Sequence, residues 1–413
     1  MKAPFNTKFL IILWVGFVDY IGIGLVYPIF SVMLFDPSYN LVDPEMSFAS
    51  RGALLGVLFS MTPLSQFFTS QLLGVFSDIK GRRLALLWGI SFGCAGYAVA
   101  ILGIWLSSLP LLFLYTILSG VCDSSAAVAQ AVVADLSNEK NKARLFGYFN
   151  SSLGLGFTIG PFIGGKLADP EFACWINCYS MPFIAAGIMM TINLILVYFL
   201  FTETHKPKSY LKFKFFKQLQ DLAKTLKFGN LKWIFLGGFA FSSGWSFFNE
   251  FLPVLWIERF QFSANDIGNF YGYSGLWYAI SAAFFVTPLL KIFTPEKIIL
   301  LAAIFCGISL SLLSLIQNPL YIWIVTPFIV SLLAIGFPTA TTVVSNRCTD
   351  DCQGEVLGIF QSIQALAMGL NPLFFGALVG FYPVTAVWGS VISMFVAALA
   401  FWASPKRKKR LQI

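Results

Sequence analysis

Charged residues are scarce in this chain of 413 residues, where Asp, Glu, Lys and Arg together make up 11%. A soluble domain carries about 25% charged residues, so this shortage excludes an ordinary water-soluble fold. Hydrophobic residues make up 57% of the chain, and the mean hydropathy is +0.78. The composition therefore predicts a protein that crosses a membrane several times, with roughly 20 apolar residues for each crossing.

Residues that build metal and catalytic sites are also few. The single histidine, His205, excludes a multi-histidine metal site. The seven cysteines include no Cys-x2-Cys pair, and no phosphate-binding loop or nucleophile–base constellation is visible. We therefore expect no metal, no cofactor and no enzymatic activity. Cys174 and Cys178 share one short loop, where they either form a disulfide or remain two thiols.

Apolar stretches long enough to span a membrane are abundant. The first is too long for a signal peptide, contains Asp19 and lacks a small-residue cleavage site, so we expect it to remain as a helix. The sequence predicts an all-α membrane protein with twelve transmembrane helices, at residues 9–34, 51–76, 84–106, 110–134, 145–168, 181–202, 231–257, 267–292, 297–316, 320–345, 355–380 and 383–403.

The basic residues predict the orientation of these spans. If the N-terminus is cytoplasmic, 24 of the 27 Lys and Arg residues lie on cytoplasmic segments. Only Arg51, Lys166 and Arg259 remain outside. We therefore expect both termini in the cytoplasm, and we attribute the net charge of +8 to membrane anchoring rather than to nucleic-acid binding.

The chain divides into two similar halves. We expect a six-helix bundle at 1–204, a basic linker at 205–230 and a second six-helix bundle with a basic tail at 231–413. The linker is either an amphipathic helix at the membrane surface or a disordered segment. The motif Gly-x-Phe-x-Ser followed by Pro and Gly occurs twice at an offset of 211 residues, from Gly147 and from Gly358. Such repeats are typical of transporters whose two halves rock about a central site.

A tight polar turn joins the second and third predicted spans. It places one carboxylate and three cations within six residues, which suits a short hairpin on the cytoplasmic side. Its glycines allow close helix approach and a turn with positive φ. We identify as its key residues Gly74, Asp78, Gly81, Arg82 and Arg83.

Three carboxylates stand inside predicted spans: Asp19, Asp123 and Glu250. A charge at the centre of a span costs about 2.5–3.5 kcal/mol, so such residues usually face a cavity and take part in function. Carboxylates of this kind can take up and release protons or pair with a cationic substrate. The alternative is a carboxyl group that stays protonated and only forms hydrogen bonds, or that lies near a helix end.

Polar and aromatic side chains accompany these carboxylates at helical spacing. Together they would line a central water-filled cavity, although polar residues can also join helices, and rings can face lipid. Rings with carboxylates suit apolar or cationic organic molecules. The predicted lining residues are Tyr20, Tyr27, Thr116, Gln130, Trp245, Ser246, Tyr271, Trp277, Tyr278, Gln361, Gln364 and Asn371.

A glycine-rich motif in the fifth span predicts close helix packing. The residues are Gly156, Gly160, Pro161, Gly164 and Gly165. We expect the first, second and fourth of these positions to pack against the glycines that open the eighth span, at 268 and 272.

Four segments resemble the major facilitator superfamily, and within it the twelve-span drug/proton antiporters such as the tetracycline exporters. They are the turn at 74–83, the segment from Asp19 to Pro28, the fourth span from Ser119 to Asp135, and the glycine motif of the fifth span. In two places the chain departs from the family pattern. The family's fourth span usually carries an arginine near the position of Thr116 that is linked to proton coupling, and this chain lacks that arginine. The matching turn of the second half, at 290–296, keeps almost none of the glycine signature.

The resemblance implies a proton-coupled exporter of small organic molecules, monomeric and located in the inner membrane. It also implies that Asp78 belongs to a gate near the end of span eleven, with Arg82 or Arg83 paired within the first half. The missing arginine favours a second hypothesis, an importer of a metabolite such as a nucleoside, amino acid or metal chelate. A third is a membrane sensor or scaffold that does not transport.

Overall fold

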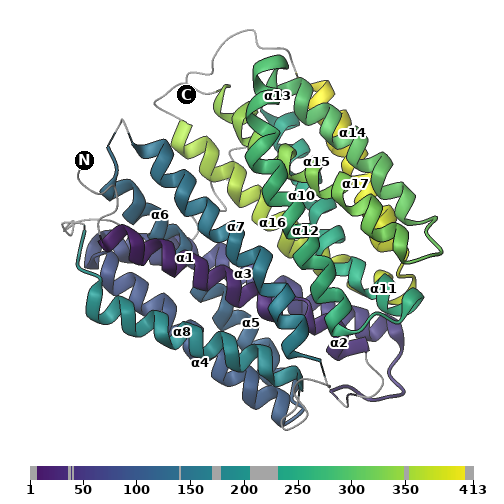
Figure 1. The fold of residues 1–413 in the computed structure, drawn as a ribbon, viewed down its shortest axis with the longest axis horizontal. Coiled ribbons are helices and arrows are strands. Elements are labelled where there is room, and N and C mark those ends of the chain that lie inside the picture. The colour runs from purple at the N-terminus through teal and green to yellow at the C-terminus, as the bar shows by residue number, and fades with distance from the viewer. Residues whose placement is uncertain are drawn as a thin grey trace. The chain divides into compact units, whose positions relative to one another are not determined.

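The computed structural model describes residues 7–35, 39, 41–138, 141–169, 178–204, 231–347 and 353–404. Every regular element within these residues is a helix (Figure 1). The prediction of an all-α protein is confirmed for this part of the chain. The predicted linker at 205–230, the basic tail and Cys174 lie outside the described residues.

Within the described residues, nine helices are long and apolar enough to cross a membrane, or ten if one bent pair counts as a single span. The bent pair is α12 (Ala264–Phe284) with α13 (Val286–Ile292), which meet at 42°. Two predicted spans are not among them. The fifth, α7 (Lys142–Leu167), carries six glycines and three basic residues, and the seventh is divided into three shorter pieces. The count of twelve therefore stays a prediction.

One compact unit comprises residues Met1–Met46, Met61–Phe215 and Phe262–Tyr273. In it α7 packs along α1 (Thr7–Val26), and α4 packs on both α5 and α8. The helices that lie wholly in this unit, besides α1 and α7, are α2 (Ile29–Phe35), α4 (Arg82–Trp105), α5 (Leu109–Asp123), α6 (Ser125–Leu136), η1 (Cys178–Ser180) and α8 (Met181–Leu200).

The second unit comprises residues Ser47–Ser60, Phe216–Gln261 and Ser274–Ile413. Here α10 and α14 both pack on α17. Its helices are α10 (Lys232–Ser246), the π-helix η2 (Phe247–Phe251), α11 (Leu252–Phe260), α13, α14 (Pro295–Leu313), α15 (Leu320–Ser345), α16 (Gln353–Phe381) and α17 (Thr385–Ala403). The first residues of α3 (Phe48–Lys80) belong to this second unit, and the first residues of α12 belong to the first. The division of the sequence at 204 and 231 into two six-helix bundles stays a prediction.

The glycine stripe of α7 packs against α1. A Cβ added at Gly156 would lie 2.6 Å from the carbonyl oxygen of Phe17, and one at Gly160 would lie 2.7 Å from that of Ile21. The expectation that this stripe faces the eighth span is therefore wrong. Residues at i, i+4 and i+8 share one helix face, and the residue that follows points about 100° away. Gly165 takes that neighbouring direction and meets Gly268 of α12.

The internal repeat appears as equivalent packing in the two units. In the first unit a Cβ at Gly165 would lie 2.8 Å from the Cα of Gly268. In the second unit a Cβ at Gly376 would lie 2.9 Å from the Cα of Gly56. Gly376 follows Gly165 by the repeat offset of 211 residues. These similar contacts support the predicted equivalence of the fifth and eleventh spans, which stays a prediction.

Candidate functional site

Asp19 is enclosed in the middle of α1, an otherwise almost wholly apolar helix, and is only 3% exposed. Its Oδ2 atom accepts a hydrogen bond from the Ser125 hydroxyl at 3.1 Å. Its Oδ1 atom is buried and has no hydrogen-bond partner among the described residues. A buried oxygen without a hydrogen-bond partner is uncommon in proteins, so we expect this oxygen to bind a proton, a cation or another ligand.

A helix break places Asp123 and Ser125 beside it. The fourth predicted span is interrupted at Ser124, where α5 ends at Asp123 and α6 begins at Ser125. The backbone N–H of Ala127 donates to the Ser124 carbonyl at 3.3 Å, which is the tighter i to i+3 pattern. Two consecutive serines weaken a helix because their hydroxyls compete for backbone groups. This local signal could have predicted the break.

Asp19 and Asp123 line one interior pocket. The pocket is closely packed and leaves no room for a whole water molecule. The remaining lining residues come from α4, α5 and α8, and they are Gly93, Tyr97, Tyr115, Ser119, Cys122 and Met190. The sequence analysis expected the two carboxylates to line one central cavity together with Glu250, and it missed the two tyrosines.

The other two polar positions selected on the fourth span lie on either side of the break. Thr116 of α5 is buried, and its hydroxyl donates to the Phe113 carbonyl at 2.8 Å. Gln130 lies on α6 and is half-buried. Tyr20 on α1 and Tyr27 in the turn after α1 are both half-buried. That these residues line a central cavity with Thr116 and Gln130 stays a prediction.

Glu250 lies in the π-helix η2 of the second unit and is 5% exposed. The Ser246 hydroxyl donates to its Oε2 atom at 2.6 Å. One turn earlier, the Ser243 carbonyl accepts a hydrogen bond from the side-chain amide of Asn371 at 3.1 Å. Short π-helical turns occur frequently at functional sites, because they displace one residue from the regular helical register.

Rings from three helices of the second unit meet around Trp245. Its ring centroid lies 6.1 Å from those of Phe248 and Tyr278 and 5.9 Å from that of Phe337. The structure thus brings together two of the predicted lining rings, Trp245 and Tyr278, with Phe248. It adds Phe337, which the sequence analysis did not select.

The remaining predicted lining residues are spread over both units. Tyr271 lies in the first unit, where its ring centroid is 5.4 Å from that of Phe270. Trp277, in the second unit, is half-buried. On α16, Gln361 is exposed, Gln364 is half-buried and Asn371 is buried. A cavity common to all these residues stays a prediction.

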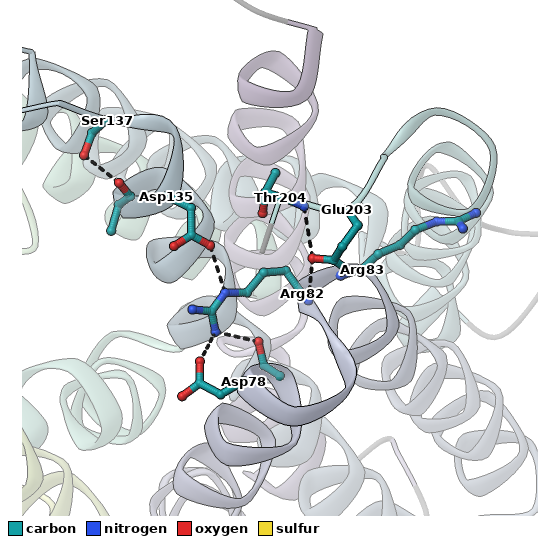
Figure 2. A network of polar contacts seen from close by, with 9 residues as sticks. Asp78, Arg82, Arg83, Asp135, Ser137, Glu203 and Thr204 are labelled. Carbon is teal, nitrogen blue, oxygen red and sulfur yellow. Dashed lines mark hydrogen bonds and ion pairs between the residues drawn. The ribbon is translucent and has the colours of Figure 1, made fainter. Parts of the chain in front are cut away.

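Arg82 joins three polar side chains at the turn between α3 and α4 (Figure 2). Its Nη1 atom donates to Asp78 at 2.6 Å and to the Ser77 hydroxyl at 2.9 Å. Its Nε atom donates to Asp135, near the end of α6, at 3.0 Å. The prediction that an arginine of this turn pairs within the first half is confirmed. Gly81 supplies the positive φ of 102° that the turn requires.

A carboxylate after α8 caps the start of α4 (Figure 2). The backbone N–H groups of Arg82 and Arg83 donate to Glu203 at 3.0 and 3.1 Å. The first N–H groups of a helix have no partner within the helix, and a negative charge there is stabilising. The sequence analysis did not select Glu203. The Arg83 guanidinium donates to the Tyr198 carbonyl and lies 5.7 Å from the centre of its ring.

No metal centre competes with this assignment among the residues that the structure describes, since no group of three or more His, Cys, Asp or Glu side chains there could hold a metal ion. The candidate site of the first unit is the carboxyl pair of Asp19 and Asp123, which line one pocket. In the second unit it is Glu250 with the rings around Trp245.

Comparisons with known proteins identify the family and the fold of the chain. The sequence model of the Major Facilitator Superfamily matches residues 12–372. The class C tetracycline resistance protein of Escherichia coli is 28% identical over 98% of this chain and 97% of its own. The quinolone resistance protein NorA of Staphylococcus aureus is 25% identical over 90% of both chains. A solved D-xylose–proton symporter shares the fold, with a TM-score of 0.78 at 17% identity over 98% of this chain and 99% of that one. This is a multi-pass membrane protein, and it belongs to the Major Facilitator Superfamily.

Proposed function

We propose that the protein exports small organic molecules, apolar or cationic and drug-like, in exchange for protons. Two relatives that extend over at least 90% of the chain are named for resistance to tetracycline and to quinolones, which supports an export function. The two halves of the chain alternate the substrate site between the two sides of the membrane by a rocking motion. The observation that carries the proposal is the buried Asp19 carboxyl group with its unpartnered oxygen.

The Asp19 carboxyl group is the proton site of this proposal. The Ser125 hydroxyl holds one oxygen and leaves the other without a partner, so a proton can bind there without breaking a protein hydrogen bond. Asp123 lines the same pocket and provides a second carboxyl group. Two carboxyl groups that line one pocket can pass a single proton between them or exchange it for a cationic substrate group. Glu250 performs the corresponding role in the second unit.

The rings around Trp245 favour flat organic molecules as substrates. Aromatic side chains bind other rings by stacking and bind cations through the electron-rich ring face. Phe248 lies in the same π-helix as Glu250, and Tyr278 and Phe337 contact Trp245 near the end of α10. A planar substrate with a positive charge would use both features.

The placement of basic residues supports an inner-membrane protein with both termini in the cytoplasm. In this orientation the Arg82 network lies at the cytoplasmic surface. The network joins the ends of α3, α4 and α6. It keeps these three helix ends together, next to the proposed gate residue Asp78, while the two halves move. We propose that the monomer is the transporting unit.

The test uses purified protein in proteoliposomes with a tetracycline and a quinolone as probes. An imposed pH gradient should drive uptake by the native chain, and Asp19→Asn should reduce this uptake at least tenfold. Substrate counterflow without a gradient should persist, because binding and the rocking motion do not need the proton. Asp43→Asn, at an exposed acidic residue, serves as the matched control.

The proton role of Asp19 is wrong if Asn at this position leaves gradient-driven uptake unchanged. The direction of transport is read from the same assay. Accumulation of substrate on the side that receives protons would favour the importer instead.

A further inference from the structure

A row of polar side chains on α3 bonds to α5 within the first unit. The Thr62 hydroxyl donates to the Thr116 carbonyl at 3.1 Å, and the Ser65 hydroxyl donates to the Ile117 carbonyl at 2.9 Å. The side-chain amide of Gln66 donates to the Asp123 carbonyl at 3.2 Å. Positions 62, 65, 66 and 69 recur at three- and four-residue steps, so they lie on one face of α3.

The helices approach closely along this row. A Cβ added at Gly120 of α5 would lie 2.6 Å from the Cβ of Ser65 and 3.0 Å from the backbone nitrogen of Gln66. The polar side chains of α3 therefore reach α5 backbone groups directly.

The bond from Gln66 differs from the other two because of the carbonyl that accepts it. Residues 116 and 117 lie inside α5, where regular helical bonds already use their carbonyl groups. Asp123 is the last residue of α5, and a continuous helix would pair its carbonyl with the N–H of Ala127. That N–H donates to Ser124 instead. Gln66 thus supplies the donor to a helix-end carbonyl that has lost its regular partner.

A second contact from α3 lies at Ser124, the residue that follows Asp123. The hydroxyl oxygens of Thr69 and Ser124 lie 2.6 Å apart, and the Ser124 hydroxyl also donates to the Gly120 carbonyl at 3.0 Å. The break places the Asp123 side chain in the pocket and allows Ser125 to reach Asp19. The geometry of the carboxyl pair therefore depends on a break that α3 holds.

We propose that Gln66 is a positioning residue for the carboxyl pair, acting through the Asp123 carbonyl to hold the break between α5 and α6. The inference rests on the proposed function, because it assumes that Asp19 and Asp123 bind the transported proton. Gln66 does not titrate and lies outside the lining of the pocket. The titratable groups that face the two carboxyl groups are Tyr20 of α1, Tyr97 of α4, and Tyr115 and Cys122 of α5.

The experiment compares Gln66→Met with Ser65→Ala in the full chain. Methionine keeps the length of the side chain and removes the amide donor. Ser65→Ala removes a hydrogen bond from the same row, one that ends on a regular helical carbonyl. Both variants should lose a similar amount of thermal stability, so a general packing effect would appear in both.

Only Gln66→Met should change the pH dependence of transport. We expect its gradient-driven uptake to fall by roughly threefold to tenfold, the range expected from one lost hydrogen bond to a buried group. The midpoint of its pH profile should move, and the KM for counterflow should stay within about twofold of the native value, since the substrate is not contacted. If Gln66→Met does not fold, Gln66→Asn tests the same bond, because its amide is one methylene too short to reach the carbonyl.

The outcomes separate this inference from the proposed function. An unchanged pH profile in the Gln66 variant, while Asp19→Asn abolishes gradient-driven uptake, overturns the positioning role alone. Equal changes of the pH profile in Gln66→Met and Ser65→Ala also overturn it, because the row would then act only as packing. Unchanged gradient-driven uptake in both Asp19→Asn and Asp123→Asn overturns both proposals.

Discussion

Replacing Gly160 by alanine should separate α1 from α7. The added Cβ would lie 2.7 Å from the carbonyl oxygen of Ile21 and 2.8 Å from the Cα of Gly24. Both are backbone atoms, so no side-chain rotation can make room. The two helices would have to move apart by roughly 0.5–1 Å to restore normal contact distances.

The cost follows from two opposing terms. Overpacking a tight contact typically costs about 1–3 kcal/mol, and a gap of 0.5–1 Å also weakens the dispersion contacts on either side. Alanine returns up to about 1 kcal/mol because it favours a helix more than glycine does. We expect a net loss of about 1–2 kcal/mol of folding free energy.

Gly154→Ala on the same helix provides the matched control. A Cβ there would meet nothing within 4 Å, so only the gain in helix propensity of up to about 1 kcal/mol remains. Thermal unfolding of the purified protein in detergent should give a lower Tm for Gly160→Ala and an equal or higher Tm for Gly154→Ala. Equal Tm values in the two variants would refute the close packing of α1 on α7.

Two further substitutions test the polar contacts of each unit. Arg82→Lys should lower the Tm and cost about 1.5–3 kcal/mol of folding free energy, because one ammonium group cannot bridge both Asp78 and Asp135 as the guanidinium does. Lys80→Gln in the same turn is the control, and an equal loss of Tm in both variants would contradict the bridging role. Asn371→Leu should cost only about 0.6–1.7 kcal/mol of folding free energy, the range for one hydrogen bond between transmembrane helices. A Tm equal to that of the native protein would show that this hydrogen bond does not contribute to stability.

The first-half pairing of Arg82 was predictable because the turn is short and local. Its glycines and charges stand within ten residues, and the resemblance to a known family signature narrowed the paired arginine to Arg82 or Arg83. The capping of the same turn by Glu203 was not predictable in this way. The bonded groups are 120 and 121 residues apart, and no local pattern relates them.

The glycine stripe of α7 shows a similar division. Spacing of four residues correctly predicted a surface for close packing. The spacing does not say which helix packs against that surface, since several helices present small residues. In the structure α1 packs against this surface. Gly165, which contacts α12, points about 100° away from it around the helix.

Composition and period thus predicted a membrane-spanning chain that is all-helical in the part that the structure describes, with an internal repeat and carboxylates at Asp19, Asp123 and Glu250 within its helices. These properties depend on local sequence, because each span must satisfy its own backbone hydrogen bonds and present apolar side chains to lipid. Tertiary structure decided that Tyr97 and Tyr115 line the pocket of Asp19 and Asp123, and that the Gln66 amide donates to the Asp123 carbonyl. Those contacts join residues from separate helices, so they follow from which helix faces meet rather than from any pattern along one of them.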